Sequence, residues 1–428
     1  MKLKKLEYYT LVGILSSSVA HAQGTPSPIN TGDTAWLLMS AALVLLMTAG
    51  LAFFYGGMVR NKNIVATIMQ SFIALPVVSI IWYMFGYSIA FGPTQGGFMC
   101  GLDWAFLNGD GTAPNADYGA TIPHSLFMIY QCMFAVITPA LISGAFAERM
   151  KFKSYLLFLV AWSLLIYSPL AHWVWGVGGM LRTGGTLDFA GGLVVHLSAG
   201  VSALAAAIVF GPRTDYGKAD MSPSNIPLVV VGTGLLWFGW FGFNGGSAIG
   251  SNELATTAFT NTHFAACAAA LVWMALDWIY KGKPSVVGTC IGAVVGLIAV
   301  TPASGFISTS SALIIGVVAG AAANLVALYR TKTKIDDSLD VFACHGVGGA
   351  IGVLLTGFFA SKAINSGGAD GGMGLFMSQI KGVAVTAIFC FVGTFIILKA
   401  IDAIFGLRPS VVDETKGLDM HEHGEKAG

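Results

Sequence analysis

Long apolar runs alternate with short polar connections along almost the whole chain. Eleven of these runs are long enough to cross a membrane, which takes about 20 apolar residues. They begin near Trp36, Val65, Ser125, Tyr155, Gly191, Ile226, Ala255, Ser285, Ser311, Val341 and Val383. The pattern predicts an all-α polytopic membrane protein in which residues 23–407 form one domain of eleven transmembrane helices.

The first 22 residues follow a different pattern. Lysines open the chain, an apolar run covers residues 11–19, and 20-AHA-22 fits a small-residue cleavage site. An additional N-terminal transmembrane helix is the alternative, but this run is too short to span a bilayer. We therefore expect residues 1–22 to be a signal peptide cleaved near Gln23, which places the mature N-terminus outside.

The charges of the connections give the orientation. With the N-terminus outside, eleven spans put the C-terminus inside. The inner connections then hold Arg60, Lys62, Arg149, Lys151, Lys153, Arg213, Lys218, Lys281, Lys283, Arg330, Lys332 and Lys334, and the outer ones only Arg182, Lys362 and Lys381. This asymmetry agrees with the positive-inside rule. Residues 408–428 become a polar cytoplasmic tail, whose simplest interpretation is a mobile terminus.

Composition narrows the function classes. Hydrophobic residues make up 55% of the 428 residues and charged ones only 10%, against about 25% charged in soluble domains. A net charge of +1 gives no sign of nucleic-acid binding. Five of the six cysteines fall inside apolar runs, and no CxxC pair exists. Cys100 lies in the outer loop 92–123, which is Gly-rich and expected to be irregular. Neither a disulfide framework nor a zinc site is indicated.

An internal repeat connects the two halves of the chain. Asp188 precedes His196 by eight residues at the start of the fifth run, and Asp337 precedes His345 by eight at the start of the tenth. The motif FYGG at the end of the first run also matches FNGG in the sixth. Because five is odd, two copies of a five-helix unit insert with opposite orientation, so we expect an inverted repeat of helices 1–5 and 6–10 followed by helix 11.

Helix geometry places the two histidines near each other. Eight residues rise about 12 Å, and half the hydrocarbon core is about 15 Å. If Asp188 and Asp337 cap their helices near opposite membrane faces, His196 and His345 both come close to the midplane. The alternative is that each histidine only stabilises helix packing. Ionisable groups inside membranes usually line a pathway, so we favour neutral, pore-lining imidazoles that exchange a hydrogen bond or a proton.

The remaining histidines are weaker candidates. His124, His172 and His263 have no counterpart in the other half, and His172 lies near an outer interface, where a structural role is expected. No H-E-x-x-H pattern is present, and the acidic residues do not cluster with the histidines. An intramembrane metalloenzyme is therefore disfavoured, and we expect neither a catalytic residue nor a metal or cofactor.

Aromatic residues give a second candidate site. An interfacial belt accounts for Trp36 and Trp104, but 237-WFGWFGFNGGS-247 concentrates rings in the middle to outer part of a span. Aromatic faces attract cations, and Ser247 adds a hydroxyl acceptor. This stretch predicts a site for a small cation.

Several ordered motifs then identify a family. They are 52-AFFYGGMVRNKN-63, 144-GAFAERMKF-152, 171-AHWVWG-176, 187-LDFAGGLVVH-196, 240-WFGFNGGSA-248, 301-TPASGFI-307 and 341-VFACHGVGG-349. With them the sequence resembles the Amt/Mep/Rh ammonium transporter family, and its bacterial Amt branch in particular, from about Asp33 to the tail.

The resemblance implies a homotrimer in the bacterial cytoplasmic (inner) membrane, in which each protomer has its own narrow hydrophobic pore. It assigns an external recruitment site to Trp175, Phe134 and Ser247 with Trp240 nearby, a gate to Phe134 and Phe243, twin pore histidines to His196 and His345, and a supporting acid to Asp188. Where many members have a second phenylalanine, this chain has Tyr130, whose hydroxyl could add a contact to the incoming cation.

The expected function is ammonium uptake for nitrogen supply. NH4+ would be recruited at the aromatic site, lose its proton near the gate and cross as NH3 past the histidines, with the proton left outside or moved separately. Methylammonium is the expected second substrate. The resemblance also implies a trimeric PII-type signal protein bound at the tail, for which 416–427 is the candidate segment. The alternatives are an ammonium sensor that signals through its tail and a neutral small-solute channel.

Overall fold

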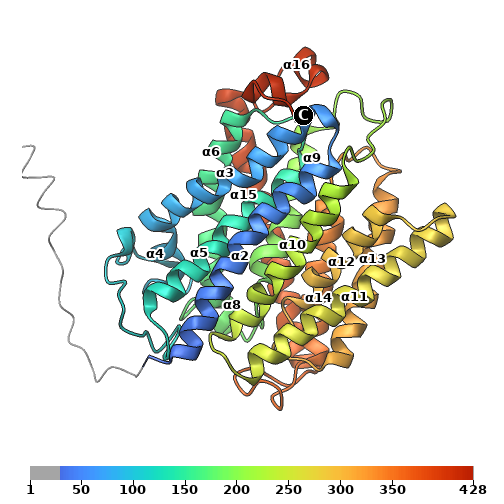
Figure 1. Ribbon diagram of the computed structural model, residues 1–428. Coiled ribbons are helices and arrows are strands. Elements are labelled where there is room, and N and C mark those ends of the chain that lie inside the picture. Colours follow the sequence, from blue (N-terminus) through green and yellow to red (C-terminus); the bar gives the residue numbers. More distant parts are fainter. Residues whose placement is uncertain (1–28, 428) are drawn as a thin grey trace, which may run out of the picture.

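The computed structural model describes residues 29–427 as a bundle of long helices lying side by side (Figure 1). The expected signal peptide, residues 1–22, lies outside the described residues. Short 3-10 or π-helical segments carry the label η. The first half contains α2 (Thr31–Met58), η1 (Asn61–Asn63), α3 (Ile64–Ile81), η2 (Trp82–Gly86), α4 (Tyr87–Phe91), β1 (Thr94–Gln95), β2 (Met99–Cys100), η3 (Ala105–Leu107), α5 (His124–Ile142), η4 (Ser143–Ala145), α6 (Phe152–Trp162), η5 (Ser163–Tyr167), α7 (Ser168–Trp175), α8 (Met180–Thr183), η6 (Gly192–Leu197) and α9 (Ser198–Phe210).

The second half and the tail complete the chain. They contain α10 (Ile226–Gly245), η7 (Gly246–Ala248), α11 (Glu253–Lys281), α12 (Val286–Val300), α13 (Thr309–Arg330), η8 (Phe342–Val347), α14 (Gly348–Phe359), α15 (Met373–Phe405), α16 (Val411–Lys416) and η9 (Asp419–His423). The prediction of an all-α membrane protein is confirmed.

Ten helical segments of the described chain are long and apolar enough to cross a membrane. The predicted eighth span coincides with α12, which has only 15 residues. At 1.5 Å per residue such a helix is about 22 Å long, against a hydrocarbon core of about 30 Å. Each predicted run therefore lies in a helix, while the count of eleven spans and their orientation remain predictions.

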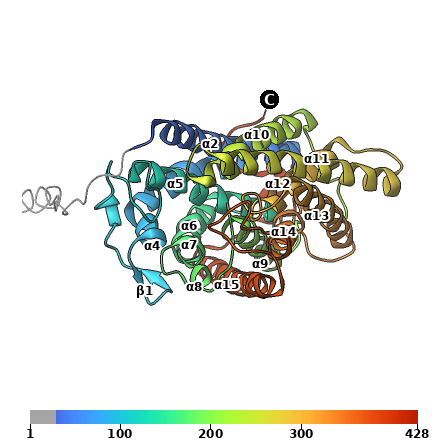
Figure 2. The same cartoon turned by 90° about the horizontal axis from the view of Figure 1, so that it is seen from below.

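The first helices of the two halves, α2 and α10, pack antiparallel along their length (Figures 1 and 2). Gly57, near the end of α2, faces the backbone of Asn225 and Val229 at the start of α10. Gly242, near the end of α10, faces Ser40 in the first part of α2. Such close backbone approach needs small residues, and the antiparallel contact is the one that an inverted repeat requires.

The fifth and tenth predicted spans meet in the same manner. Each opens with a π-helical turn, η6 and η8, and continues as α9 and α14. Gly200 of α9 contacts the backbone of Gly346, whereas Gly349 of α14 lies against the backbone of Gly192 and Leu197. The order of these contacts shows that the two segments cross with opposite directions.

Replacing Gly200 by alanine is expected to destabilise the bundle, because the added methyl group would collide with backbone atoms of Gly346, which cannot rotate away. Overpacking of this kind costs roughly 1–3 kcal/mol. The thermal midpoint of the detergent-solubilised protein, followed by tryptophan fluorescence, should fall. Gly234→Ala in α10 is the matched control, because nothing lies within 4 Å of the added methyl group; an equal loss there would contradict the packing explanation.

The connections predicted to face the cytoplasm gather at one end of the bundle around buried ion pairs. Glu148 accepts hydrogen bonds from Arg60 and lies 3.4 Å from Arg213, which forms a bidentate pair with Asp336 at 2.9 Å. Burial opposes ionisation of Glu148, but the hydrogen bonds and charges of Arg60 and Arg213 outweigh it and hold its pKa below the ordinary value. Arg149 is fully buried and donates to backbone carbonyls of the same loops. The network ties these connections together.

The tail packs against this end of the bundle, so the expectation of a mobile terminus is wrong. Glu414, Leu418 and Asp419 are buried. The Glu414 carboxylate accepts two hydrogen bonds from Arg408, at 2.7 and 2.6 Å. Asp419 accepts the Ala66 N–H at 2.8 Å, near the start of α3. Figure 1 shows α16 on the end of the bundle where the C-terminus lies.

The outer loop 92–123 is largely irregular, as expected, apart from the short antiparallel pair β1 and β2. The Cys100 thiol donates to the Gly92 carbonyl at 2.9 Å and lies 3.0 Å from Nδ1 of His172. The other ring nitrogen of His172 lies 2.9 Å from the Thr94 hydroxyl. These contacts fasten the loop to α7 and agree with a structural role for His172.

Candidate functional site

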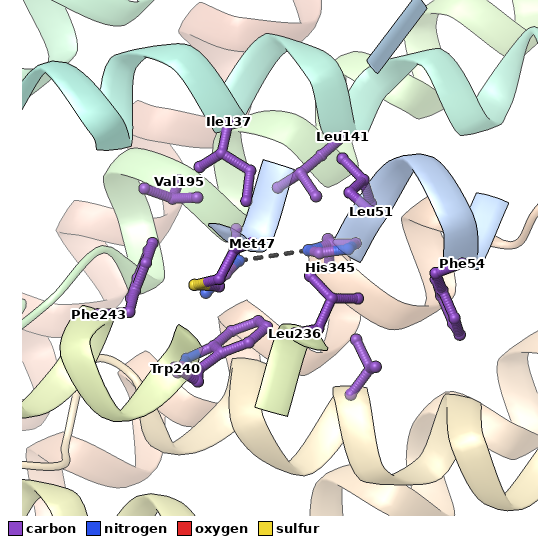
Figure 3. Close-up of a pocket in the computed structure, with 12 residues that line it drawn as sticks. Met47, Leu51, Phe54, Ile137, Leu141, Val195, Leu236, Trp240, Phe243 and His345 are labelled. Atoms are coloured by element: carbon purple, nitrogen blue, oxygen red, sulfur yellow. Dashed lines mark hydrogen bonds between the residues drawn. The ribbon is translucent and has the colours of Figure 1, made fainter. Parts of the chain in front are cut away.

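His196 and His345 lie side by side in the interior of the bundle. Their Nδ1 atoms are 3.3 Å apart, and the side chains expose 1% and 4% of their surface. Figure 3 draws this contact of His345 as a dashed line among the labelled apolar side chains. One ring therefore donates its Nδ1 hydrogen while the other accepts it. The other ring nitrogen of His196, Nε2, has no hydrogen-bond partner among residues 29–427. A buried polar atom without a partner is costly, so this nitrogen is available to a ligand.

Apolar side chains surround this pair. The cavity of about 10 Å³ is lined by Met47, Leu51, Phe54, Ile137, Leu141, Val195, His196, Leu236, Trp240, Phe243, Val294 and His345. A second narrow cavity shares His345 and continues past Tyr55, Cys344 and Leu339. Each has room for about one water-sized molecule. Neither lining includes Asp, Glu, Lys or Arg, so a neutral molecule fits this path and a bare ion does not.

Two stacked rings close the end of this path nearest the loop 92–123, which is predicted to lie outside. The centroids of Phe134 in α5 and Phe243 in α10 lie 4.2 Å apart, with the ring planes tilted by 30°. Phe243 also stacks on His196, with centroids 5.9 Å apart. Phe243 lines the cavity that contains the two histidines, and Phe134 lines a separate cavity on the other side of the stacked rings. The two residues assigned to the gate therefore separate the two cavities.

The outer cavity has a volume of about 160 Å³ and combines aromatic faces with hydrogen-bond acceptors. Its lining consists of Phe91, Asp117, Tyr118, Phe127, Gln131, Phe134, Trp175, Phe189, Ser247 and Ile249. The ring of Trp175 meets Phe134 edge to face, with centroids 6.0 Å apart. Ser247 donates its hydroxyl hydrogen to the Phe243 carbonyl at 2.8 Å, which leaves its lone pairs for a donor in the cavity. Three predicted recruitment residues, Phe134, Trp175 and Ser247, thus come together.

The other two predicted recruitment residues do not line the outer cavity. Tyr130 is fully buried, and its hydroxyl lies 2.9 Å from the Phe243 carbonyl and 3.2 Å from the Ser247 hydroxyl. Trp240 stacks on His196 at 5.3 Å and lines the inner cavity. The backbone carbonyls of α10 bind the Tyr130 hydroxyl, which therefore contacts Ser247 from the protein interior and not from the cavity. Trp240 lies on the histidine side of the gate.

Two polar residues of the outer cavity were not predicted from the sequence. The side-chain oxygen of Gln131 is buried and has no hydrogen-bond partner in the described part of the chain. Asp117, in the outer loop, adds an exposed carboxylate. Gln131 precedes Phe134 by three residues, which places both on one helix face, so this spacing could have identified it. Nothing in the loop sequence distinguishes Asp117 from Asp103 or Asp110.

Asp188 holds the turn that carries His196. Its carboxylate accepts the backbone N–H groups of Gly191, Gly192, Leu193 and Val194, at 2.8, 2.6, 2.7 and 3.3 Å. Gly191 has a φ of 120°, which disfavours other residues. The indole of Trp175 donates to the Asp188 carbonyl at 2.9 Å. The expected cap is therefore present, and it connects the outer cavity with the histidine pair.

The counterpart of this cap in the other half is weaker. Asp337 accepts the Phe342 N–H at 2.7 Å through one carboxylate oxygen. Its second oxygen is buried without a hydrogen-bond partner among the described residues. The repeat thus conserves the position of the carboxylate but not its full set of contacts.

Comparisons with known proteins identify the family of the chain. The sequence model of the Ammonium Transporter Family matches residues 35–428. An ammonium transporter of Bacillus subtilis is 48% identical over 92% of this chain and 98% of its own length, and Amt1 of Archaeoglobus fulgidus is 45% identical over 93% and 100%. The crystal structure of Mep2 from Saccharomyces cerevisiae superposes with a TM-score of 0.85 at 35% identity, covering 90% of this chain and 88% of Mep2. A solved sensor Amt protein, 29% identical, reaches 0.84 and covers 92% and 98%. The chain is a multi-pass membrane protein and belongs to the Ammonium Transporter Family.

Proposed function

We propose that this protein transports ammonium by recruiting NH4+ in the outer cavity and conducting NH3 along the histidine path. The observation that carries the proposal is the uncharged lining of both inner cavities, in which the imidazoles of His196 and His345 lie. Transfer of an unpaired ion into such surroundings is prohibitively costly. A molecule that crosses as an uncharged species and can donate and accept hydrogen bonds fits the path.

The outer cavity supplies what an ammonium ion requires. The rings of Phe134 and Trp175 attract its charge. The Ser247 hydroxyl and the unpartnered oxygen of Gln131 accept its hydrogens. Potassium has a similar size and the same charge but donates no hydrogen bonds, so directed acceptors favour ammonium. Deprotonation at the gate then yields NH3, which the gate rings admit more readily than a charged ion.

The histidine pair accounts for passage beyond the gate. With one hydrogen shared between the Nδ1 atoms, the pair remains neutral and presents further ring nitrogens to NH3. In one version of the proposal the proton stays outside, and in the other it follows separately along the two imidazoles. Both versions use the same residues and differ in net charge movement.

The test is transport by the purified protein in liposomes. We expect saturable uptake of radiolabelled methylammonium that ammonium inhibits and an equal concentration of potassium does not. A neutral-solute channel predicts uptake insensitive to ammonium, and a sensor predicts binding without flux; either result overturns the proposal. Charge movement recorded on a supported membrane distinguishes the two proton versions, because uptake without current eliminates the one in which the proton follows.

Tyr130→Phe is expected to weaken capture without closing the path. The substitution removes the hydroxyl that contacts Ser247 and the Phe243 carbonyl and leaves the ring in place. One lost hydrogen bond corresponds to roughly 1 kcal/mol, so the KM for methylammonium should rise about fivefold with little change in maximal rate. Tyr155→Phe is the matched control, since its buried hydroxyl has no partner among the described residues. A similar rise in KM for the control would contradict the positioning role of Tyr130.

We further propose that the protein is a homotrimer with a PII-type partner at the tail end. The helix α11 follows the outer edge of the bundle (Figure 2), and its mid-span His263 is exposed beside Trp237 and Phe241. A polar side chain facing lipid is unfavourable, and a second copy packed on this face would cover it. Size-exclusion chromatography with light scattering tests the trimer; a monomer would refute it.

A further inference from the structure

A basic cavity lies between the end of the bundle and the folded tail, away from the conduction path. Its volume is about 450 Å³. Four cationic side chains line it: Arg60 and Lys62 from the connection between α2 and α3, and Lys416 and Lys426 from the tail. The lining contains a single acid, Asp419. The cavity is therefore formed jointly by two parts of the chain, each of which contributes positive charge.

Most of this charge is not compensated by the protein. Arg60 is paired with Glu148 at 2.7 Å and with Asp215 at 3.4 Å. Lys62 donates only to main-chain carbonyls, those of Glu414 and Thr415. Lys416 and Lys426 are exposed, and neither forms an ion pair with a carboxylate within residues 29–427. Three ammonium groups therefore face the cavity without a carboxylate partner.

The nearby acids are directed elsewhere. Asp419 accepts the N–H of Ala66 through Oδ1 and so caps the start of α3, while its buried Oδ2 has no hydrogen-bond partner among the described residues. Glu414 is bound to Arg408 and to the Thr214 N–H, and Glu422 accepts the Phe152 N–H. Glu425 is exposed and forms no ion pair in the described chain. The excess of positive charge in the cavity thus persists after its surroundings are considered.

We propose that this cavity binds a phosphate-bearing anion, which bridges the membrane domain and the tail. Phosphate oxygens accept charge-assisted hydrogen bonds from several lysine and arginine groups at once, and convergent cations raise the local concentration of anions. The volume is large enough for a phosphate with an attached group. Two sources share this chemistry: a soluble phosphate compound, and the headgroup of an anionic phospholipid, since the cavity adjoins the start of the span Asn61–Phe91.

Occupancy would connect the tail to the bundle through its own lysines. Lys416 ends α16 and Lys426 lies close to the last described residue, Ala427. An anion that binds these lysines together with Arg60 and Lys62 adds contacts that exist only while the tail is docked. The bound anion should therefore slow backbone hydrogen exchange over residues 411–427.

The experiment uses the full-length protein in neutral detergent. Pyrophosphate is titrated by calorimetry, and native mass spectrometry counts bound phosphatidylglycerol against phosphatidylcholine. The variant Lys416→Gln/Lys426→Gln removes two exposed cations of the cavity. Its affinity for the bound probe should fall roughly tenfold or more, because two charge-assisted contacts are lost. Lys332→Gln/Lys334→Gln is the matched control, with the same charge change on exposed residues outside the lining.

The outcomes separate the sources. Pyrophosphate binding that weakens only in the tail variant supports a soluble ligand, and phosphatidylglycerol binding that weakens only there supports the lipid. Absence of binding by both probes overturns the site. An equal effect of the tail and control variants overturns it as well, because general surface charge would then account for the binding.

Discussion

Replacing His345 by alanine is expected to weaken the preference for ammonium over potassium strongly while the protein remains folded. His345 lines both inner cavities and is the hydrogen-bond partner of His196. Its removal leaves the Nδ1 of His196 without its partner and widens a path that now admits about one water-sized molecule. Loss of a buried hydrogen-bonding group costs about 1–3 kcal/mol, so the ratio of ammonium to potassium flux should fall roughly tenfold or more.

The measurement compares the uptake of radiolabelled methylammonium with that of radiolabelled potassium in the same liposomes, which does not depend on net charge movement. His421→Ala is the matched control, because that ring is exposed in the tail and lines neither inner cavity. Size-exclusion chromatography of both variants separates transport from assembly. If His345→Ala preserves selectivity, or removes transport only by dissociating or unfolding the protein, the histidine has a packing role and the proposed path is wrong.

The histidine pair shows what a one-dimensional pattern can predict. The eight-residue spacing of Asp188–His196 recurs in Asp337–His345, and helix rise converts this spacing into depth in the membrane. Because the two copies are inverted, both histidines come to the same depth near the midplane, so a contact such as the observed one at 3.3 Å could be expected. The π-helical form of η6 and η8 could not be expected from the sequence, because it depends on how the two segments pack against each other.

Tyr130 shows where residue-by-residue reasoning from the family stops. The resemblance placed its hydroxyl beside the incoming cation, but that hydroxyl lies against backbone carbonyls of α10. Backbone acceptors have no signature in the side-chain sequence. The donors in two tail contacts, the Ala66 N–H bound by Asp419 and the Leu418 N–H bound by the Asn63 side chain, are also backbone groups, so these contacts could not be predicted. The tail therefore looked like a mobile terminus.

The cap at Asp188 connects stability with transport. Its carboxylate satisfies four backbone donors at the start of η6, and this turn carries His196. The Asp188 carbonyl also holds the Trp175 indole in the outer cavity. One residue thus fixes groups on both sides of the gate, so a change there should affect the whole path.

Asp188→Ala is expected to lower stability by about 3 kcal/mol or more, since several buried N–H groups lose their acceptor and each costs about 1–3 kcal/mol. Methylammonium uptake per folded molecule should fall at least tenfold because the His196 turn is released. Asp188→Asn should lose less stability, as one oxygen still accepts. Asp337→Asn is the matched control: its carboxylate has one unpartnered oxygen that an amide can replace. Thermal midpoints and methylammonium uptake are measured for all variants. If Asp337→Asn loses as much stability and uptake as Asp188→Asn, the four-donor cap does not explain the effect of Asp188.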